Sequence, residues 1–240
     1  MTKYTRSFFY LLGYRIYSIF SRPFISQSSK VVFRDKNKLL ASLFEKFGSD
    51  KGSLSGKSRH NYHLYYELFF AANRTEVKNV LEIGIGTNNE FFTSSMGRGG
   101  TPGASLRAFR DFFPNAKIFG LDIDKKCLIF EDRISSAWVD QRDLISLNNI
   151  LEHFRNSGVS FDLIIDDGLH TKSSAKNTLE TTFALLRPGG LYVIEDIPKR
   201  KVKSYLKLTN SYGSHCYFFC GNSQKTHRLY TDNNILFIRR

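Results

Sequence analysis

The chain has 240 residues, enough for one well-buried α/β domain with a modest extension and too few for two domains with independent cores. Its 41% hydrophobic and 15% aromatic content exclude a mainly disordered protein. The net charge of +13 is concentrated at the front, where residues 1–60 hold twelve Lys or Arg against Asp35, Glu45 and Asp50.

Residues 1–37 are predicted to form a basic extension, an amphipathic helix followed by a linker. Residues 8–20 read FFYLLGYRIYSIF, and on a helix Phe8, Leu12, Ile16 and Ile19 would share one face. The stretch falls short of the ~20 residues that a membrane-spanning helix needs. No small-x-small cleavage site of a signal peptide follows it. The remainder, with Pro23 and several serines, is typical of a linker.

The extension and the cysteines bear on location and partners. Basic residues in this part of the chain would attract anionic lipid or the phosphates of a nucleotide- or lipid-linked sugar. Residues 6–22 would then contact an inner membrane surface, or else pack on the domain itself or on a partner subunit of a homo-oligomer. Cys127, Cys216 and Cys220 form no disulfide framework, which fits a reducing compartment and a cytoplasmic protein.

Residues 38–240 are predicted to form one α/β domain around a mostly parallel, seven-stranded sheet. From residue 78 onwards, short β-branched runs alternate with longer amphipathic segments, the pattern of a parallel sheet covered by helices. A Gly-, Ser- and Lys-rich loop at 48–62 precedes this alternating part of the domain. We expect strands at 78–84, 117–123, 137–141, 161–167 and 190–196, helices near 38–47, 65–72, 104–113, 145–154 and 174–186, and a C-terminal antiparallel hairpin from 215–221 and 234–240.

The segment after the first strand indicates an adenosyl pocket. Gly84 and Gly86 allow a tight turn and close approach of the backbone to a ligand. Asp122 ends the second strand, where an acid can accept both ribose hydroxyls. In a dinucleotide-binding protein the glycine loop runs directly into a helix that faces the pyrophosphate. Here a loop insertion at 87–102 intervenes, which favours a cofactor without phosphates, S-adenosylmethionine, and is also a candidate lid over the acceptor.

The strongest group of candidate catalytic residues follows the fourth and fifth strands. Asp166, Asp167 and His170 come after one strand, and Glu195 and Asp196 come after the other. Both strand ends lie at the carboxyl edge of a parallel sheet, where open α/β folds bind ligands. Three converging carboxylates repel one another unless a proton or a cation sits among them. Hard oxygen ligands select Mg²⁺ or a similar ion, and His170 could accept the proton of a hydroxyl held there.

Taken in order, these segments resemble the metal-dependent macrolide-sugar O-methyltransferases of the macrocin and mycinose type and their relatives in polysaccharide gene clusters. The resemblance covers residues 44–200 and rests on SDKG with HNY, LEIGIG, GASLRAFRDFFPNA, GLDID, VDQ, IIDDGLH and PGGLYVIED. It implies a class I, Rossmann-like methyltransferase fold. It also implies cofactor contacts from Lys51, His60, Tyr62, Glu82, Gly84, Gly86, Asp122, Asp140, Gln141 and Asp166, metal ligation by Asp167, Glu195 and Asp196, and His170 as general base; Asp166 could instead orient its loop.

The expected function is therefore Mg²⁺-assisted transfer of a methyl group from S-adenosylmethionine to a sugar hydroxyl of a glycan, a nucleotide sugar or a glycosylated natural product. The insertion at 87–102 and the PKRK at 198–201 depart from the macrolide enzymes near the expected acceptor entrance. A catechol-like acceptor is the alternative. A nucleic-acid-binding methyltransferase is less favoured, because the chain has no nucleic-acid-binding motif and no nucleic acid partner is expected. A non-catalytic scaffold would not need His170 and the acids.

Overall fold

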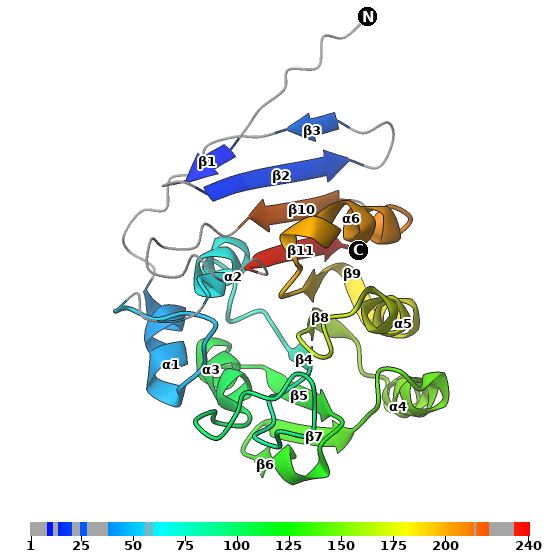
Figure 1. The fold of residues 1–240 in the computed structure, drawn as a ribbon. Coiled ribbons are helices and arrows are strands. Elements are labelled where there is room, and N and C mark those ends of the chain that lie inside the picture. Colours follow the sequence, from blue (N-terminus) through cyan, green and yellow to red (C-terminus); the bar gives the residue numbers. More distant parts are fainter. Residues whose placement is uncertain are drawn as a thin grey trace, which may run out of the picture.

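The computed structural model describes residues 9–11, 14–20, 25–27, 38–55, 58, 60–213, 215–220 and 233–240. These residues form an eleven-stranded sheet with helices on both faces, seen edge-on in Figure 1. Along the sheet the strands follow the order β1-β2-β10-β11-β9-β8-β4-β5-β7-β6, with β3 paired to β2.

The central strands confirm the predicted methyltransferase fold. β4 (Asn79–Ile83), β5 (Lys117–Asp122), β7 (Ile134–Trp138), β8 (Phe161–Asp166) and β9 (Leu186–Ile194) are parallel, whereas β11 (Asn234–Arg239) and β10 (His215–Cys220) add an antiparallel hairpin beside β9. The chain builds β4, β5 and β7 in one direction and then returns to place β8 on the other side of β4. This reversal opens a crevice at the carboxyl ends of β4 and β8, where such sheets bind ligands.

Helices cover both faces of the sheet. α1 (Leu39–Phe47), α2 (Tyr62–Phe70) and α3 (Ala104–Phe112) lie on one face, and α4 (Leu144–Asn156), α5 (Lys172–Thr182) and α6 (Val202–Thr209) lie on the other (Figure 1). The short elements are η1 (Lys125–Cys127), β6 (Phe130–Glu131), η2 (Phe183–Leu185) and η3 (Lys199–Lys201).

Alternation along the strands divides the core in two. On β4, Val80 packs with the core of the α1–α3 face, whereas Leu81 and Ile83 pack with the core of the opposite face. On β9, Val193 packs with the first core and Ile194 with the second. Because side chains of a strand alternate between faces, this parity decides which way each acid at a strand end points.

The prediction of a helix over residues 8–20 is wrong. The described part forms β1 (Phe9–Leu11) and β2 (Tyr14–Phe20), which are followed by β3 (Ile25–Gln27). β2 pairs antiparallel with β10, with Ile19 opposite Cys216. Aromatic and β-branched residues favour strands, and β10 offers unpaired backbone groups at the sheet edge. Residues 6–8, 12–13, 21–24 and 28–37 lie outside the described residues, so the expected membrane contact and linker stay predictions.

Three further segments refine the predicted elements. β7 ends at Trp138, three residues before the predicted end, and the backbone N–H of Val139 donates to the carbonyl of Asp122 where the chain leaves the sheet. α6, which was not predicted, follows the basic PKRK segment and buries Tyr205 and Thr209. Residues 87–102 contain turns but neither helix nor strand, as expected for a loop insertion.

Among the helices that the structure describes, none has the length and apolar character to cross a bilayer.

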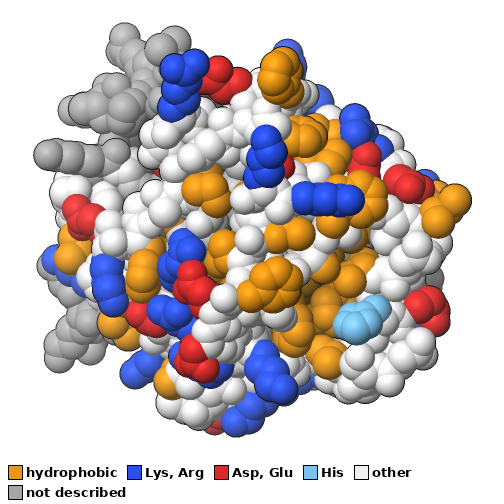
Figure 2. All heavy atoms as spheres, turned by 90° about the horizontal axis from the view of Figure 1, so that it is seen from below, with side chains coloured by type: hydrophobic (Ala, Val, Ile, Leu, Met, Phe, Trp, Pro, Cys, Tyr) orange, Lys and Arg blue, Asp and Glu red, His pale blue; other side chains and the backbone are white. Residues whose placement is uncertain are grey.

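The end of the sheet that carries β6 and β7 exposes hydrophobic side chains. Seen from below, hydrophobic side chains gather across the middle of this face, with Lys and Arg around them (Figure 2). Phe130 on β6, Trp138 on β7 and Ile145 on α4 are among the exposed large hydrophobic residues of the chain. Exposed apolar surface is common at subunit contacts, and the expected homo-oligomer stays a prediction.

Glu67 on α2 links folding stability to pH. Its Oε1 accepts a 2.7 Å hydrogen bond from the backbone N–H of Leu40 at the start of α1, and burial raises the pKa of Glu67 from 4.5 to about 7. A carboxyl group with a raised pKa stabilises the fold at low pH, and this contribution is lost as the pH rises from its unfolded pKa to its folded pKa.

We expect Glu67→Gln to remove this dependence. The unmodified protein should lose unfolding free energy as the pH rises, and the variant should not. The difference between the two proteins should therefore shift in favour of Glu67→Gln by up to about 3 kcal/mol between pH 5 and pH 8. Urea denaturation of both proteins at the two pH values measures the difference. An equal difference at both pH values would contradict the assignment.

Candidate functional site

A cavity of about 420 Å³ lies at the carboxyl ends of β4, β8 and β9. A second cavity of about 240 Å³ shares Gly84, Ser94 and Asp122 with it and also contains Asp140 and Gln141. The two cavities therefore meet over the glycine loop. The predicted site residues that line the larger cavity are Lys51, His60, Tyr62, Gly84, Gly86, Asp122, Asp167, His170, Glu195 and Asp196.

The glycine loop and Asp122 form the floor between the cavities. Gly84 and Gly86 have φ angles of +85° and +87°, in the left-handed region that favours glycine. The two Asp122 carboxylate oxygens each accept a 2.9 Å backbone hydrogen bond, from Ile85 and from Asp124. These bonds fix the carboxylate, and each oxygen keeps a further lone pair for a ligand hydroxyl.

Gly84 has no room for a methyl group. A Cβ there would lie 2.2 Å from the backbone oxygen of Asp167, whereas a Cβ at Gly97, which also has a positive φ, would meet nothing within 4 Å. Gly97→Ala should therefore cost only backbone strain, about 1 kcal/mol of unfolding free energy.

We expect Gly84→Ala to be clearly less stable than Gly97→Ala and to lose most binding of S-adenosylhomocysteine, because the loop after β8 must shift. Thermal unfolding and calorimetric titration of both variants test this. Equal behaviour of the two variants would show that close approach at Gly84 is unimportant.

The insertion at 87–102 folds back over the glycine loop. The backbone N–H of Met96 donates to the carbonyl of Thr87 at 2.9 Å, and the Met96 side chain fills the space beside Gly86. Ser94 lines both cavities, and Phe91 and Phe92 line the smaller one. The insertion thus forms a wall of both cavities, and its expected role as an acceptor lid stays a prediction.

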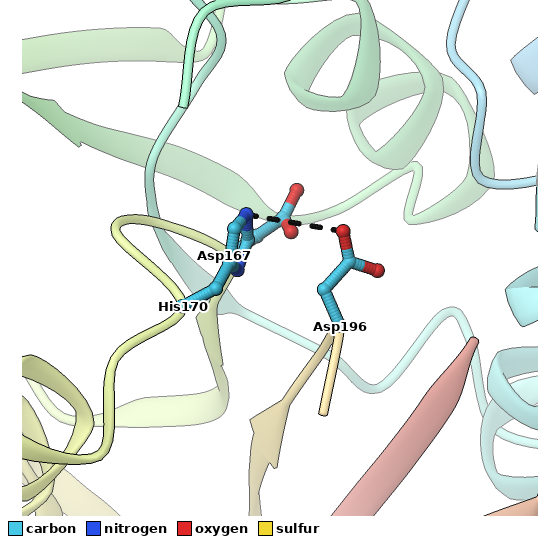
Figure 3. Close-up of side chains that lie close together, drawn as sticks. All are labelled: Asp167, His170 and Asp196. Atoms are coloured by element: carbon cyan, nitrogen blue, oxygen red, sulfur yellow. Dashed lines mark ion pairs between the residues drawn. The ribbon is translucent and has the colours of Figure 1, made fainter. Parts of the chain in front are cut away.

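Asp167, His170 and Asp196 converge at the larger cavity. Asp167 and His170 belong to the loop after β8, and Asp196 follows β9, so the three side chains meet across the gap between two strand ends (Figure 3). His170 Nε2 lies 3.8 Å from an Asp196 oxygen. One ligand atom of each residue lies within 4.8 Å of those of the other two. The two carboxylates offer the hard oxygen donors that suit a divalent cation such as Mg²⁺, and the imidazole lies beside them.

Two of these residues have unusual backbone conformations. His170 and Asp196 have φ angles of +53° and +51°, which are rare outside glycine. Tyr62 holds Asp196 from two sides, because its hydroxyl donates to Oδ1 at 2.6 Å and accepts from the backbone N–H at 3.2 Å. His60 is buried and stacks on Tyr62, and its Nε2 lies 3.6 Å from Asp196. Such conformations persist where the surroundings fix them, and they cluster at active sites.

Glu195 lies in a buried ion-pair cluster and also lines the larger cavity, and its predicted role as a metal ligand stays a prediction. The Lys51 ammonium contacts Glu195, lies 2.5 Å from Asp167 and lies 3.3 Å from Glu82. The Tyr66 hydroxyl donates to the other Glu195 oxygen at 2.5 Å. Residue parity explains the direction, because Glu195 follows Ile194 and so points to the α1–α3 face. We call Asp167, His170 and Asp196, whose ligand atoms lie within 4.8 Å of one another, the metal-type group.

The cation of this cluster is Lys51, which was predicted to contact the cofactor. Burial alone would lower the pKa of Lys51, but the Asp167 and Glu195 carboxylates outweigh burial and hold that pKa well above its ordinary value. Lys51 is therefore charged. The cation that three converging carboxylates require is in part supplied by the chain itself.

Glu82 and Asp166 do not line either cavity. Glu82 accepts a 2.6 Å hydrogen bond from Ser105, and burial raises its pKa to about 7. Asp166 points to the opposite face and accepts from the Gln141 amide at 2.7 Å, and burial raises its pKa to about 6. Gln141 in turn accepts from the backbone N–H of Leu169 at 2.8 Å. Asp166 and Gln141 thus brace the loop that carries Asp167 and His170.

Four contributors to the site were not predicted from the sequence. Strand parity could have indicated that Glu82 and Glu195 lie on one face and share a buried cation. No local pattern in the sequence indicates the four residues that contact the predicted ones, because they are distant in sequence. These contributors are Tyr66 beside Glu195, Ser105 beside Glu82, Thr178 beside Gln141, and Asn233, whose Oδ1 lies 3.1 Å from His60 Nδ1.

The sequence matches the family model described as "Methyltransferase domain" over residues 58–228. Over 138 residues the chain is 36% identical to the mycinamicin VI 2''-O-methyltransferase of Micromonospora griseorubida, covering 58% of this chain and 32% of that protein. It is 33% identical over 158 residues to the 8-demethyl-8-alpha-L-rhamnosyl tetracenomycin-C 2'-O-methyltransferase of Streptomyces olivaceus, covering 66% of this chain and 37% of that protein. The chain thus spans about a third of the length of these relatives.

Among solved structures, the fold is similar to the MycE methyltransferase from the mycinamycin biosynthetic pathway in complex with Mg and SAH. That match has a TM-score of 0.59 and 25% sequence identity, and covers 83% of this chain and 54% of that one. The complex that also contains mycinamycin VI matches with a TM-score of 0.54 and 33% identity over 65% of this chain and 36% of that one. These findings confirm the resemblance expected from the sequence motifs.

Proposed function

Since the chain belongs to the methyltransferase domain family, we propose that it transfers a methyl group from S-adenosylmethionine to a sugar hydroxyl with the assistance of a divalent cation. The observation that carries this proposal is the meeting of two sites at one cavity. Gly84, Gly86 and Asp122 form an adenosyl-type floor, and Asp167, His170 and Asp196 lie in the same lining. A methyl donor and an activated hydroxyl have to meet at such a place.

The donor set fits a magnesium-type ion. The Asp167 and Asp196 carboxylates are partly exposed to the cavity and lie close enough to share one ion. They would hold it, and Glu195 would join them only if its ion pair with Lys51 opened. When bound, the cation would lower the pKa of the acceptor hydroxyl and S-adenosylmethionine would supply an electrophilic methyl group.

The residues of the chain supply binding, orientation and a proton acceptor. Asp122 would accept hydrogen bonds from the ribose hydroxyls through its remaining lone pairs. Asp140, which lines the smaller cavity, would lie beside the adenine. His170 Nε2 would accept the proton of the attacking hydroxyl while the hydroxyl oxygen bonds to the methyl carbon, the methyl–sulfur bond breaks and its electron pair stays on sulfur. The Asp196 carboxylate 3.8 Å away would stabilise the resulting imidazolium.

The acceptor is a sugar in this proposal because three relatives are named for acceptors that carry a rhamnosyl or an olivosyl group. The proposed acceptor is a glycan, a nucleotide sugar or a glycosylated natural product. With a glycan or nucleotide-sugar acceptor, the protein would act in polysaccharide biosynthesis. The cytoplasmic location stays a prediction.

Transfer of a labelled methyl group to a panel of acceptors tests the function. The panel contains nucleotide sugars, alkyl glycosides and catechol, each assayed with Mg²⁺ and with excess EDTA. We expect labelling of a sugar that EDTA abolishes and added Mg²⁺ restores. Labelling of catechol alone would favour the other acceptor class, and labelling that persists in EDTA would remove the cation from the mechanism.

A further inference from the structure

We propose that Lys51 is an internal cation that competes with the divalent ion for the carboxylates of the site, so that the lysine sets the metal affinity of the protein. This inference rests on the proposed metal-assisted function.

Burial and contacts support a structural role of the Lys51 charge. The side chain is 3% exposed, and its ammonium contacts Glu195, Asp167 and Glu82. Asp167 belongs both to this cluster and to the group with His170 and Asp196. The lysine and a bound divalent ion would therefore share one carboxylate.

Charge balance gives the direction of the effect. Buried carboxylates at this spacing need a cation nearby, and Lys51 provides it when no other ion is present. A divalent ion at Asp167 and Asp196 would add positive charge close to the ammonium. Repulsion between partly buried like charges a few ångströms apart is large enough to change a binding constant by about tenfold or more.

The loop that carries Lys51 connects this competition to the rest of the site. The carbonyl of Lys51 accepts from the backbone N–H of His63 at 3.3 Å, and the carbonyl of Asp50 accepts from His60 at 3.0 Å. His60 and Tyr62 both contact Asp196. A lysine displaced by the ion would therefore move a loop that also positions the second carboxylate of the metal-type group.

The test compares Mn²⁺ binding to the full chain and to Lys51→Met, without cofactor, by calorimetric titration. We expect Lys51→Met to bind Mn²⁺ about tenfold more tightly or better, and to gain more thermal stability from saturating Mn²⁺ than the unmodified chain does. Lys46→Met is the matched control, because Lys46 is 61% exposed and pairs with Asp111 away from the site, so its Mn²⁺ affinity should be unchanged.

If Lys51→Met does not fold, Lys51→Gln is measured in the same way, because its amide can still donate to Glu195. Equal or weaker Mn²⁺ binding by the folded Lys51 variant, alongside clear binding by the unmodified chain, would overturn the competition and leave the proposed function intact. Absence of Mn²⁺ binding in all three proteins would overturn both.

Discussion

Replacing His170 by Asn should lower the rate of methyl transfer by about 100- to 10,000-fold, the usual contribution of a general base. His170 is 29% exposed at the cavity, and its Nε2 lies 3.8 Å from Asp196. Of the histidines that the structure describes, it is the one in the metal-type group. Asn is the suitable replacement because the backbone φ of +53° is tolerated better by Asn than by most residues. Stability and affinity for S-adenosylhomocysteine should therefore change little.

His153→Asn is the matched control, because His153 is exposed on α4 and contacts Phe154 rather than the site. The rates of methyl transfer by the two variants are compared under single-turnover conditions, which isolate the chemical step. Their affinities for S-adenosylhomocysteine are compared separately. A rate for His170→Asn within about threefold of the control would assign the proton to another acceptor.

Replacing Asp196 by Asn should reduce turnover by about 1000-fold or more, because the site would lose a proposed charged ligand of the cation and the carboxylate beside His170. The φ of +51° again makes Asn compatible with the backbone, and its side-chain oxygen can still accept from Tyr62. Mn²⁺ affinity should fall together with turnover, whereas binding of S-adenosylhomocysteine should persist.

The matched control is Asp132→Asn, a surface carboxylate with 88% exposure. Titration of Mn²⁺ and of S-adenosylhomocysteine into both variants separates the metal from the cofactor. Normal Mn²⁺ affinity in Asp196→Asn would place the ion elsewhere, and joint loss of both ligands would indicate a general collapse of the cavity.

Most of the fold follows from local patterns in the sequence. A continuous apolar run such as Leu163–Ile165 is stable only in a strand whose two faces are both buried, which requires helices on both sides of the sheet. Gly84 and Gly86 after the first strand, and acids after the later strands, then follow from the position of the carboxyl edge.

The front of the chain shows where such patterns fail. Ile16 and Ile19 satisfy a helical spacing, yet both belong to β2. A short apolar run fits a helix or a strand equally well by periodicity. The choice is made by β10, some 200 residues later in the chain, whose edge pairs with β2. A partner that distant has no signature within the local window.

The site was predicted at the level of residue types but not of side-chain directions. Asp167, Glu195 and Asp196 do meet at one cavity, as expected, whereas Asp166 does not line it. Strand parity sends Glu195 toward Lys51 and Asp166 toward Gln141, which leaves Asp167 and Asp196 with His170. The loop at 48–55 shows no local sign that its lysine reaches a cluster 116 residues away at Asp167. Long-range electrostatics of this kind appear only when the fold is assembled.

A crystal structure of the protein with Mn²⁺ and S-adenosylhomocysteine, with the ion located by its anomalous signal, tests the whole account. We predict one Mn²⁺ in direct contact with the Asp167 and Asp196 carboxylates, and the adenosyl group above Gly84 and Gly86 with its ribose on Asp122. An ion bound away from these two carboxylates, or a cofactor outside this cavity, would contradict it.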